Sequence, residues 1–305
     1  MSRSCLNIRY LTVAVCDAGL DTQIAKLMVD RFIAQGIHIP DTVLTSVEIR
    51  KADGRFIVMR RHADGKVYDA EIYDQVFNCW GRKSRSGGLK LENMPGVKVS
   101  SDASQAIEGG NHGILEMTGN ERVFAVGDVL KGAVNNYPAA TITGLKTARI
   151  IKDLIYVEDL RNAKDTPSQP FAKEVIYRKY GQPTQSFKLL TIKCIPGVSV
   201  VGLTENQAIS QYGKNQVTSI LFKIRPLLED FADNDLDMHH YKIVAIRDTG
   251  KIVGLHYIGE NGADIMHGLL IAVSQGLTVQ MLRDSFFIHP SRSEGFWKAA
   301  MLMDL

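Results

Sequence analysis

The chain has 305 residues, and its 36 basic and 33 acidic side chains give a net charge of only +3. The basic residues form no run of five or more, so nucleic acid is not expected as the main partner. No stretch of about 18 apolar residues is present and the first residues lack a signal-peptide pattern, which predicts a cytoplasmic protein that does not cross a membrane. With 45% hydrophobic residues, the chain is long enough for two or three globular domains.

Four cysteines stand far apart in the sequence: Cys5, Cys16, Cys79 and Cys194. They form neither a CxxC pair nor the regular spacing of a zinc site. Isolated cysteines behave as small apolar residues unless a cation or a second thiol lies near. We therefore expect four reduced, mostly buried thiols and no metal site.

The first part of the chain has the pattern of an α/β domain. Residues 11–15 are a short apolar run rich in branched side chains, and residues 21–35 follow with apolar residues at helical spacing. Short strand-like segments lie at 43–50 and 55–61, and residues 67–72 lead into a candidate for a buried strand at 75–80. This order predicts half of an α/β domain.

A strand followed by a tight turn and a helix is expected next. Residues 121–126 form an apolar strand that Gly127-Asp128 closes, and residues 141–156 show helical periodicity. Strand, Gly-Asp, loop and helix is an arrangement typical of nucleotide sites. Residues 158–175 are polar, with few large apolar side chains, which predicts a linker at a domain boundary.

The rest of the chain has the pattern of an α+β domain. Strands are expected at 198–203, 218–224, 241–246 and 252–258. Asp248-Thr-Gly250 separates the last two, which predicts a hairpin. Residues 262–275 follow as a helix with one apolar face.

An imidazole and a carboxylate lie close together near the end of the sequence, in His289-Pro-Ser-Arg-Ser-Glu294. The apolar run 286–288 before them is expected to be a strand, with the pair at its exit. A carboxylate orients an imidazole and raises its basicity, which suits proton transfer to and from a thiol at neutral pH. The residues alone leave two interpretations open: His289 and Glu294 are a candidate catalytic pair, or a surface histidine that lies beside a glutamate.

Four sequence segments resemble the class I flavoprotein (pyridine nucleotide-) disulfide reductase family, of the thioredoxin reductase or glutathione reductase type. Val123-Phe-Ala-Val-Gly-Asp-Val129 is similar to the family's second flavin fingerprint, and Tyr137-Pro-Ala-Ala-Thr-Ile-Thr-Gly144 to the helix start that follows it. Val201-Gly-Leu-Thr-Glu-Asn-Gln-Ala208 and Val253-Gly-Leu-His-Tyr-Ile-Gly-Glu-Asn-Gly-Ala-Asp264 are similar to parts of its interface domain. The segments are collinear with the family over nearly the whole chain.

The resemblance implies a partial Rossmann-like FAD/NAD(P)-binding region, α/β in class, followed by the α+β dimerisation domain. Its parts are expected to be a partial nicotinamide-binding domain (1–95), the last segment of the FAD-binding domain (96–160), a linker (161–172) and the dimerisation domain (173–305). The family would use Gly127, Asp128, Pro138 and Ala139 for FAD, and Gly81 and Arg82 for the nicotinamide cofactor.

The family's activity further implies a homodimer, with His289 and Glu294 handling thiol protons, and thioredoxin or glutathione as substrate. The chain has no GxGxxG turn and no Cys-x4-Cys disulfide, and Asp17 does not support a preference for NADPH. Two interpretations stay open: the chain is an N-terminally truncated part of an FAD-dependent NAD(P)H:disulfide oxidoreductase, or it is a non-catalytic dimerising pseudoenzyme derived from one.

Overall fold

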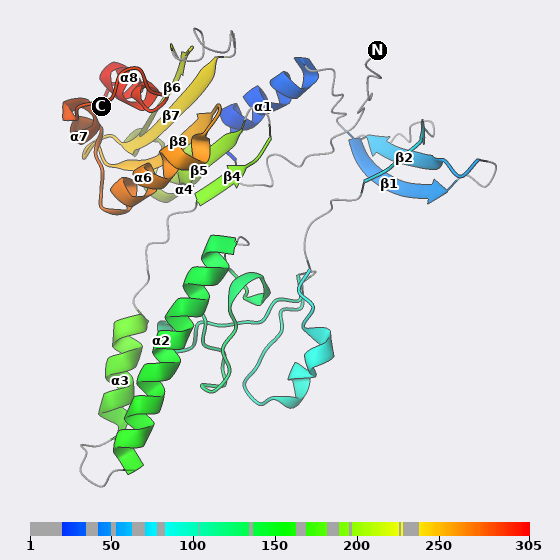
Figure 1. The fold of residues 1–305 in the computed structure, drawn as a ribbon, viewed down its shortest axis with the longest axis vertical. Helices are drawn as coiled ribbons and strands as arrows, with labels where there is room; N and C mark the ends of the chain where they lie inside the picture. Colours follow the sequence, from blue (N-terminus) through cyan, green and yellow to red (C-terminus); the bar gives the residue numbers. More distant parts are fainter. Residues whose placement is uncertain are drawn as a thin grey trace. The chain divides into compact units, whose positions relative to one another are not determined.

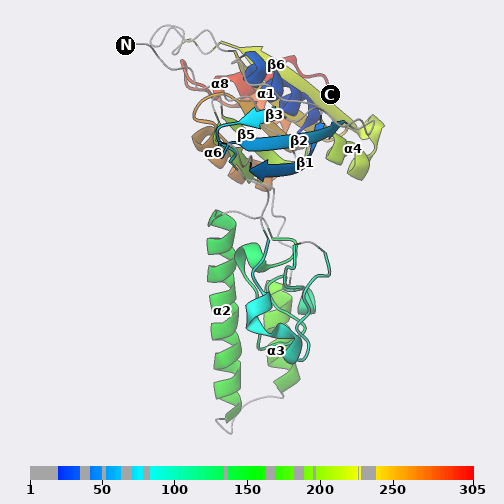
Figure 2. The same ribbon diagram turned by 90° about the vertical axis from the view of Figure 1, so that its right-hand side faces the viewer.

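The computed structural model divides the chain into two compact units. One unit comprises residues 1–77 and 186–305, and the other comprises residues 78–185 (Figures 1 and 2). The structure describes residues 20–34, 42–49, 53–62, 71–77, 83–102, 104–133, 137–162, 169–181, 189–194, 197–225, 227 and 238–305. Within the described residues, every helix is too short or too polar to span a lipid bilayer.

A five-stranded antiparallel sheet forms the centre of the first unit. Its strand order is β4-β5-β8-β7-β6. The strands are β4 (Leu189–Ile192), β5 (Val198–Gly202), β6 (Val217–Ile224), β7 (His239–Ile246) and β8 (Ile252–Ile258). The predicted hairpin is confirmed, because β7 pairs directly with β8 and Gly250 between them has a φ of 64°, which favours glycine.

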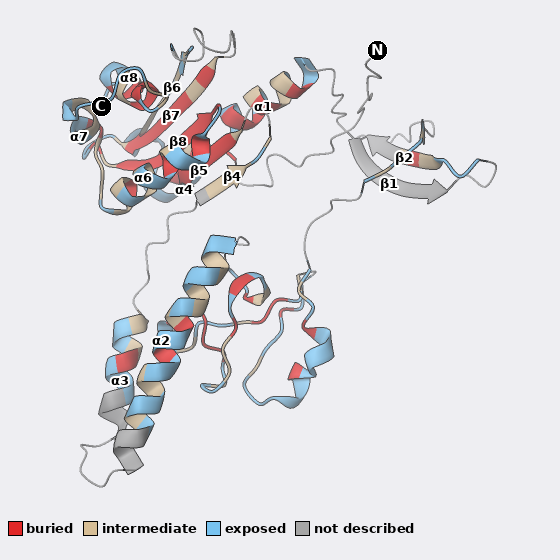
Figure 3. Ribbon diagram, in the orientation of Figure 1, coloured by how far each residue is buried: buried red, intermediate tan, exposed pale blue. Residues whose placement is uncertain are grey.

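Helices cover both faces of this sheet. Successive side chains of a strand point to opposite faces. On one face, side chains such as Tyr241, Tyr257 and Leu255 pack with α6 (Gly262–Ser274) and α8 (Glu294–Leu302). Every residue of β8 is buried, as Figure 3 shows for the centre of the sheet. The prediction of a mixed fold, with an α+β domain after a partial α/β region, agrees with this architecture.

The other face of the sheet is covered by α1 (Thr22–Ala34) and α4 (Glu205–Tyr212). The buried side of α1 presents Leu20, Ile24, Ala25, Met28 and Phe32, which pack against Val198, Val200 and Ile258. Figure 1 shows α1 alongside β5 and β8. The helix predicted at 21–35 is thus confirmed, and it is packed on the sheet of the C-terminal domain, although its sequence indicated a place in the nicotinamide-binding half.

A buried lysine joins α1, α4 and the sheet. The Nζ atom of Lys242 donates to Asp21 Oδ1 and Glu205 Oε2, both at 2.7 Å, and to Gln23 Oε1 at 2.8 Å. The side chains of Lys242 and Asp21 are only 1% and 2% exposed. The other oxygen of Asp21 accepts from the backbone N–H of Glu205 at 3.1 Å. The charge of Lys242 is therefore matched by acceptors from two helices.

Two short helices and a small sheet complete the described part of this unit. The helices are η5 (Lys214–Gln216) and α7 (Val279–Asp284), and the antiparallel sheet consists of β1 (Thr42–Ile49), β2 (Phe56–His62) and β3 (Glu71–Tyr73). The strands predicted at 43–50 and 55–61 are confirmed. The strand predicted at 75–80 is corrected, because its described residues, 75–77, are not a strand. The strand expected at 11–15 lies outside the described residues.

The second unit is built on two helices. They are α2 (Tyr137–Asn162) and α3 (Gln169–Tyr180), which lie side by side (Figures 1 and 2). The loops before them contain four 3-10 turns: η1 (Gly87–Leu89), η2 (Leu91–Asn93), η3 (Asn111–Gly113) and η4 (Gly127–Val129). The segment 158–175 is helical at both ends, because polar residues are compatible with the exposed side of a helix.

The strand predicted at 121–126 is wrong. The segment forms only an isolated bridge between Phe124 and Met117. Its apolar side chains instead take part in small clusters: Phe124 packs near Ile114, Met117 and Ile150. The apolar run reflects burial in a loop and not pairing in a sheet. The domain boundaries proposed from the sequence stay predictions.

Asp21→Asn is expected to lower the free energy of unfolding by about 3 kcal/mol, because it removes one charged partner from a buried lysine. Burial alone raises the pKa of Asp21, and the hydrogen bond and charge of Lys242 more than offset this, so its pKa lies below the usual value. A lowered pKa stabilises the fold above about pH 4 and the contribution disappears as the pH falls through the lowered pKa.

The measurement is urea denaturation of wild type and variant between about pH 3 and pH 7, the range that brackets the titration of a carboxyl group. The matched control is Asp30→Asn, since Asp30 is exposed on the same helix. The difference in the free energy of unfolding between wild type and Asp21→Asn is expected to become smaller below about pH 4. If Asp21→Asn lowers the free energy of unfolding at neutral pH no more than the control does, the Lys242 network does not hold α1 in place.

Candidate functional site

The predicted catalytic pair meets in the loop between α7 and α8. His289 Nδ1 and Glu294 Oε2 are 2.7 Å apart. The Glu294 side chain is 4% exposed at the first residue of α8, whereas the His289 side chain is 55% exposed. A buried carboxylate thus holds an imidazole whose other side faces outward.

The chemistry of this pair follows from its hydrogen bond. An ionised carboxylate only accepts hydrogen bonds, so Nδ1 of His289 carries the proton in this contact and Nε2 is the nitrogen left for exchange with a substrate. An imidazole of this kind, oriented by a carboxylate, serves as a general acid or base. The predicted pairing is therefore geometrically suited to moving protons.

Further side chains hold Glu294 and the loop. Lys298 Nζ lies 3.5 Å from Glu294 Oε1, one helical turn further along α8. The guanidinium of Arg292 lies 3.5 Å from Glu260 Oε2. Neither Lys298 nor Glu260 was predicted from the sequence. The spacing of four residues between Glu294 and Lys298 was a usable signal for the first, and only the fold reveals the second.

The strand expected at 286–288 is wrong, because these residues form an extended loop that pairs with no strand in the described part of the chain. Phe287 packs against Trp297 with the two rings tilted by 32° and their centroids 4.3 Å apart. The neighbouring side chains of Phe286 and Ile288 are exposed, the first fully and the second 78%. A loop with two large exposed apolar side chains directly before His289 is typical of an interaction surface.

The candidate FAD residues come together in the second unit. Gly127 opens η4 with a φ of 67°, and a Cβ atom there would lie 3.1 Å from Cβ of Ala140, so a glycine suits this position. Its backbone N–H donates to Thr143 Oγ1 at 3.3 Å, and this hydroxyl donates to the carbonyl of Ala139 at 2.9 Å. Thr143, which was not predicted from the sequence, thereby ties η4 to the first turn of α2.

The remaining candidate residues are placed as follows. Asp128 is exposed next to Gly127, and Pro138 is exposed in the first turn of α2. Gly81 and Arg82, proposed for the nicotinamide cofactor, lie outside the described residues. A helix start and an exposed carboxylate are suitable partners for a polar ligand.

Of the four cysteines, Cys194 alone lies among the described residues. Its thiol is half-buried, and this burial raises its pKa. In the part of the chain that the structure describes, no three His, Cys, Asp or Glu side chains are grouped to hold a metal ion.

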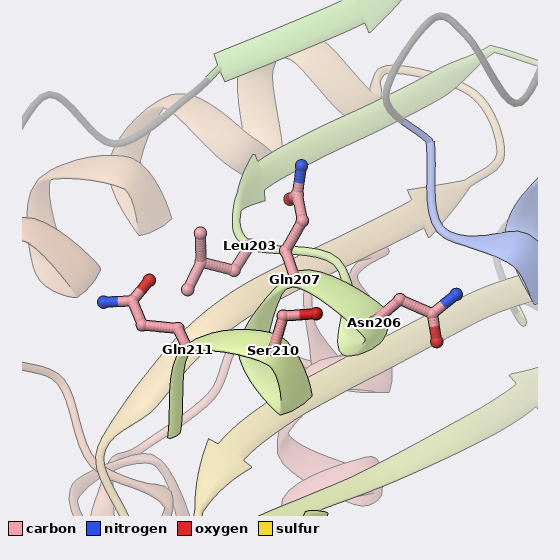
Figure 4. Close-up of a pocket in the computed structure, with 5 residues that line it drawn as sticks. All are labelled: Leu203, Asn206, Gln207, Ser210 and Gln211. Atoms are coloured by element: carbon pink, nitrogen blue, oxygen red, sulfur yellow. The ribbon is translucent and has the colours of Figure 1, made fainter. Parts of the chain in front are cut away.

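A shallow pocket of about 570 Å³ lies along α4 (Figure 4). Its lining consists of Leu203, Asn206, Gln207, Ser210 and Gln211. It includes none of the described candidate residues and no titratable side chain, so it adds nothing to the proton chemistry of the site.

Comparison with known proteins places this geometry in a family. Residues 190–300 match the pyridine nucleotide-disulphide oxidoreductase dimerisation domain. The chain is 26% identical to thioredoxin reductase 2, mitochondrial, of Drosophila melanogaster, over 93% of this chain and 49% of that protein. It is 28% identical to glutathione reductase of Nostoc sp. (91% and 55%) and 28% identical to mercuric reductase of Staphylococcus aureus (93% and 45%).

The chain thus spans about half the length of the curated relatives that it matches. The matched domain contains the five-stranded sheet almost entirely, with α4, α6 and the His289–Glu294 loop. The C-terminal part of the chain therefore contains the pyridine nucleotide-disulphide oxidoreductase dimerisation domain, and the chain as a whole is similar to thioredoxin, glutathione and mercuric reductases.

Proposed function

We propose that the chain acts as the C-terminal part of an FAD-dependent NAD(P)H:disulfide oxidoreductase, of the thioredoxin- or glutathione-disulfide reductase type. The observation that carries the proposal is the 2.7 Å contact between His289 Nδ1 and Glu294 Oε2, in a dimerisation domain of this family. In this role, Nε2 of His289 takes a proton from a substrate thiol and returns it, while Glu294 keeps the ring oriented. The relatives include a thioredoxin reductase and a glutathione reductase, so the proposed substrates are oxidised thioredoxin and glutathione disulfide.

For FAD, the fit rests on the contacts around Gly127. The glycine lets η4 approach α2 closely, so Gly127 and the carboxylate of Asp128 lie near the first turn of α2, which contains Pro138 and Ala139. These residues would hold FAD, and Gly81 with Arg82 would contact NAD(P)H. The flavin, when bound, supplies the transfer of electrons from a pyridine nucleotide to a disulfide.

The proposed partner of the chain is a second copy of itself. A dimerisation domain matches residues 190–300, and the exposed Phe286 and Ile288 lie within it. A two-fold symmetric dimer would bury the same apolar loop twice. The second candidate function, a non-catalytic dimerising protein, uses the same surface without redox chemistry. It is favoured by three departures from the pattern of the family that the chain resembles, all at functional or interface positions: Asp17, Asn136-Tyr137 in place of the usual Leu-Thr, and Gly197 in place of the usual Glu.

We expect the chain to be a dimer at micromolar concentration and Phe286→Ser to raise its dissociation constant at least about tenfold, because burying one such side chain contributes about 1.5–3 kcal/mol. Sedimentation velocity measures this. Phe77→Ser is the matched control, since Phe77 is 85% exposed but lies outside the matched domain. A monomeric wild type, or an equal effect of the control, contradicts the assigned surface.

The catalytic role of His289 is tested in a chimera that places the preceding half of Nostoc glutathione reductase before this chain. His289→Gln is expected to lower the rate of NADPH- or NADH-dependent disulfide reduction by roughly 10²- to 10⁴-fold, because it removes a general acid and base. The flavin absorbance should stay unchanged, which separates loss of chemistry from loss of cofactor.

The control for this experiment is His267→Gln, an exposed histidine on α6 of the same domain. Equal turnover of the His289→Gln variant and wild type would refute the catalytic assignment. A chimera that binds flavin but reduces no disulfide would favour the non-catalytic dimerising protein.

A further inference from the structure

Tyr241 occupies the centre of the core between the sheet and α8. It lies on β7, is 1% exposed, and contacts Phe296 of α8 edge to face with ring centroids 5.1 Å apart. Its ring also lies against the backbone of Gly295, where an added Cβ would come within 2.3–2.6 Å of three ring carbons. No side chain fits between Tyr241 and the start of α8.

The hydroxyl of Tyr241 reaches beyond this core to the catalytic loop. It donates a hydrogen bond of 2.7 Å to the backbone carbonyl of Arg292, midway between His289 and Glu294. Burial raises the pKa of Tyr241, and the charge of Glu294 acts in the same direction, so the hydroxyl keeps its proton at neutral pH. Tyr241 is therefore a permanent donor to the loop.

Arg292, in the middle of the loop, is held through both its backbone carbonyl and its side chain. Tyr241 holds its carbonyl from the core, and Glu260 lies 3.5 Å from its guanidinium at the surface. Glu294 itself is fixed as the first residue of α8, directly before the Gly295 backbone on which Tyr241 packs. Tyr241 thus contacts the chain immediately on both sides of Ser293 and Glu294.

We infer that Tyr241 is a positioning residue for the proposed catalytic pair. It fixes the 289–294 loop so that the Glu294 carboxylate stays within hydrogen-bond distance of the Nδ1–H of His289. The inference rests on the proposed function of that pair for its meaning, but not for its test. In the positioned loop, the neutral imidazole carries its proton on Nδ1 and leaves Nε2 open to a substrate. A loosened loop lets the proton redistribute to Nε2.

The test is the tautomer ratio of neutral His289, read from the ¹⁵N chemical shifts of its two ring nitrogens in the full 305-residue chain. Tyr241→Phe keeps the ring and removes only the hydroxyl. It is expected to lower the ratio of Nδ1–H to Nε2–H roughly 2- to 10-fold, the change that a hydrogen bond of ordinary net strength produces. Glu294→Gln serves as a reference, because it gives the tautomer ratio in the absence of the carboxylate.

The control is Ile243→Val, which loosens the same core on the same strand without touching the loop, and is expected to leave the ratio unchanged. An unchanged ratio in Tyr241→Phe, or an equal fall in Ile243→Val, overturns the inference. Should Tyr241→Phe not fold, Gly295→Ala decides by the same criterion, since its methyl group would displace the Tyr241 ring. Because the readout needs neither flavin nor turnover, its failure is distinct from failure of the proposed reductase function.

Discussion

The charge of Lys242, buried at the centre of the C-terminal sheet, is the constraint on which the first unit depends. An ammonium group taken out of water without partners costs several kcal/mol, so the fold has to supply acceptors wherever Lys242 is buried. Asp21 and Gln23 come from the start of α1, and Glu205 comes from the start of α4. Both helices are therefore held at defined positions on one face of the sheet. His256 lies in the same buried region, and burial lowers its pKa to about 4, so it adds no second positive charge at neutral pH.

Strand β7 connects this network to the candidate site. Tyr241 and Lys242 are neighbours in the sequence and point to opposite faces of the sheet, as successive residues of a strand do. Lys242 fixes the face that α1 and α4 cover, while Tyr241 reaches the loop of His289 and Glu294 on the other face. The position of the proposed proton-transferring pair thus depends on β7, and the Lys242 network holds this strand on the opposite face of the sheet.

Local patterns predicted those parts of the fold that short-range physics decides. The hairpin of β7 and β8 follows from two apolar runs around Asp248-Thr-Gly250, and the pairing of His289 with Glu294 follows from their proximity in the sequence. The apolar runs at 121–126 and 286–288 were misleading, because one is buried in a loop and the other is exposed on a loop, and neither joins a sheet of the described structure. The contact between Asp21 and Lys242 spans 221 positions, and no local pattern indicates such a distance. The same applies to Tyr241 and Arg292, which the fold brings together from 51 positions apart.

Native-state hydrogen exchange of the full chain tests most directly whether α1 and the C-terminal sheet are one cooperative unit. If the Lys242 network and the apolar face of α1 hold the two together, the amides of Ile24 to Met28 will exchange with the same opening free energy and denaturant dependence as those of β8. If the α1 amides instead exchange through low-energy openings that denaturant does not promote, the helix is only loosely attached, and the role of Lys242 in holding it to the sheet is contradicted.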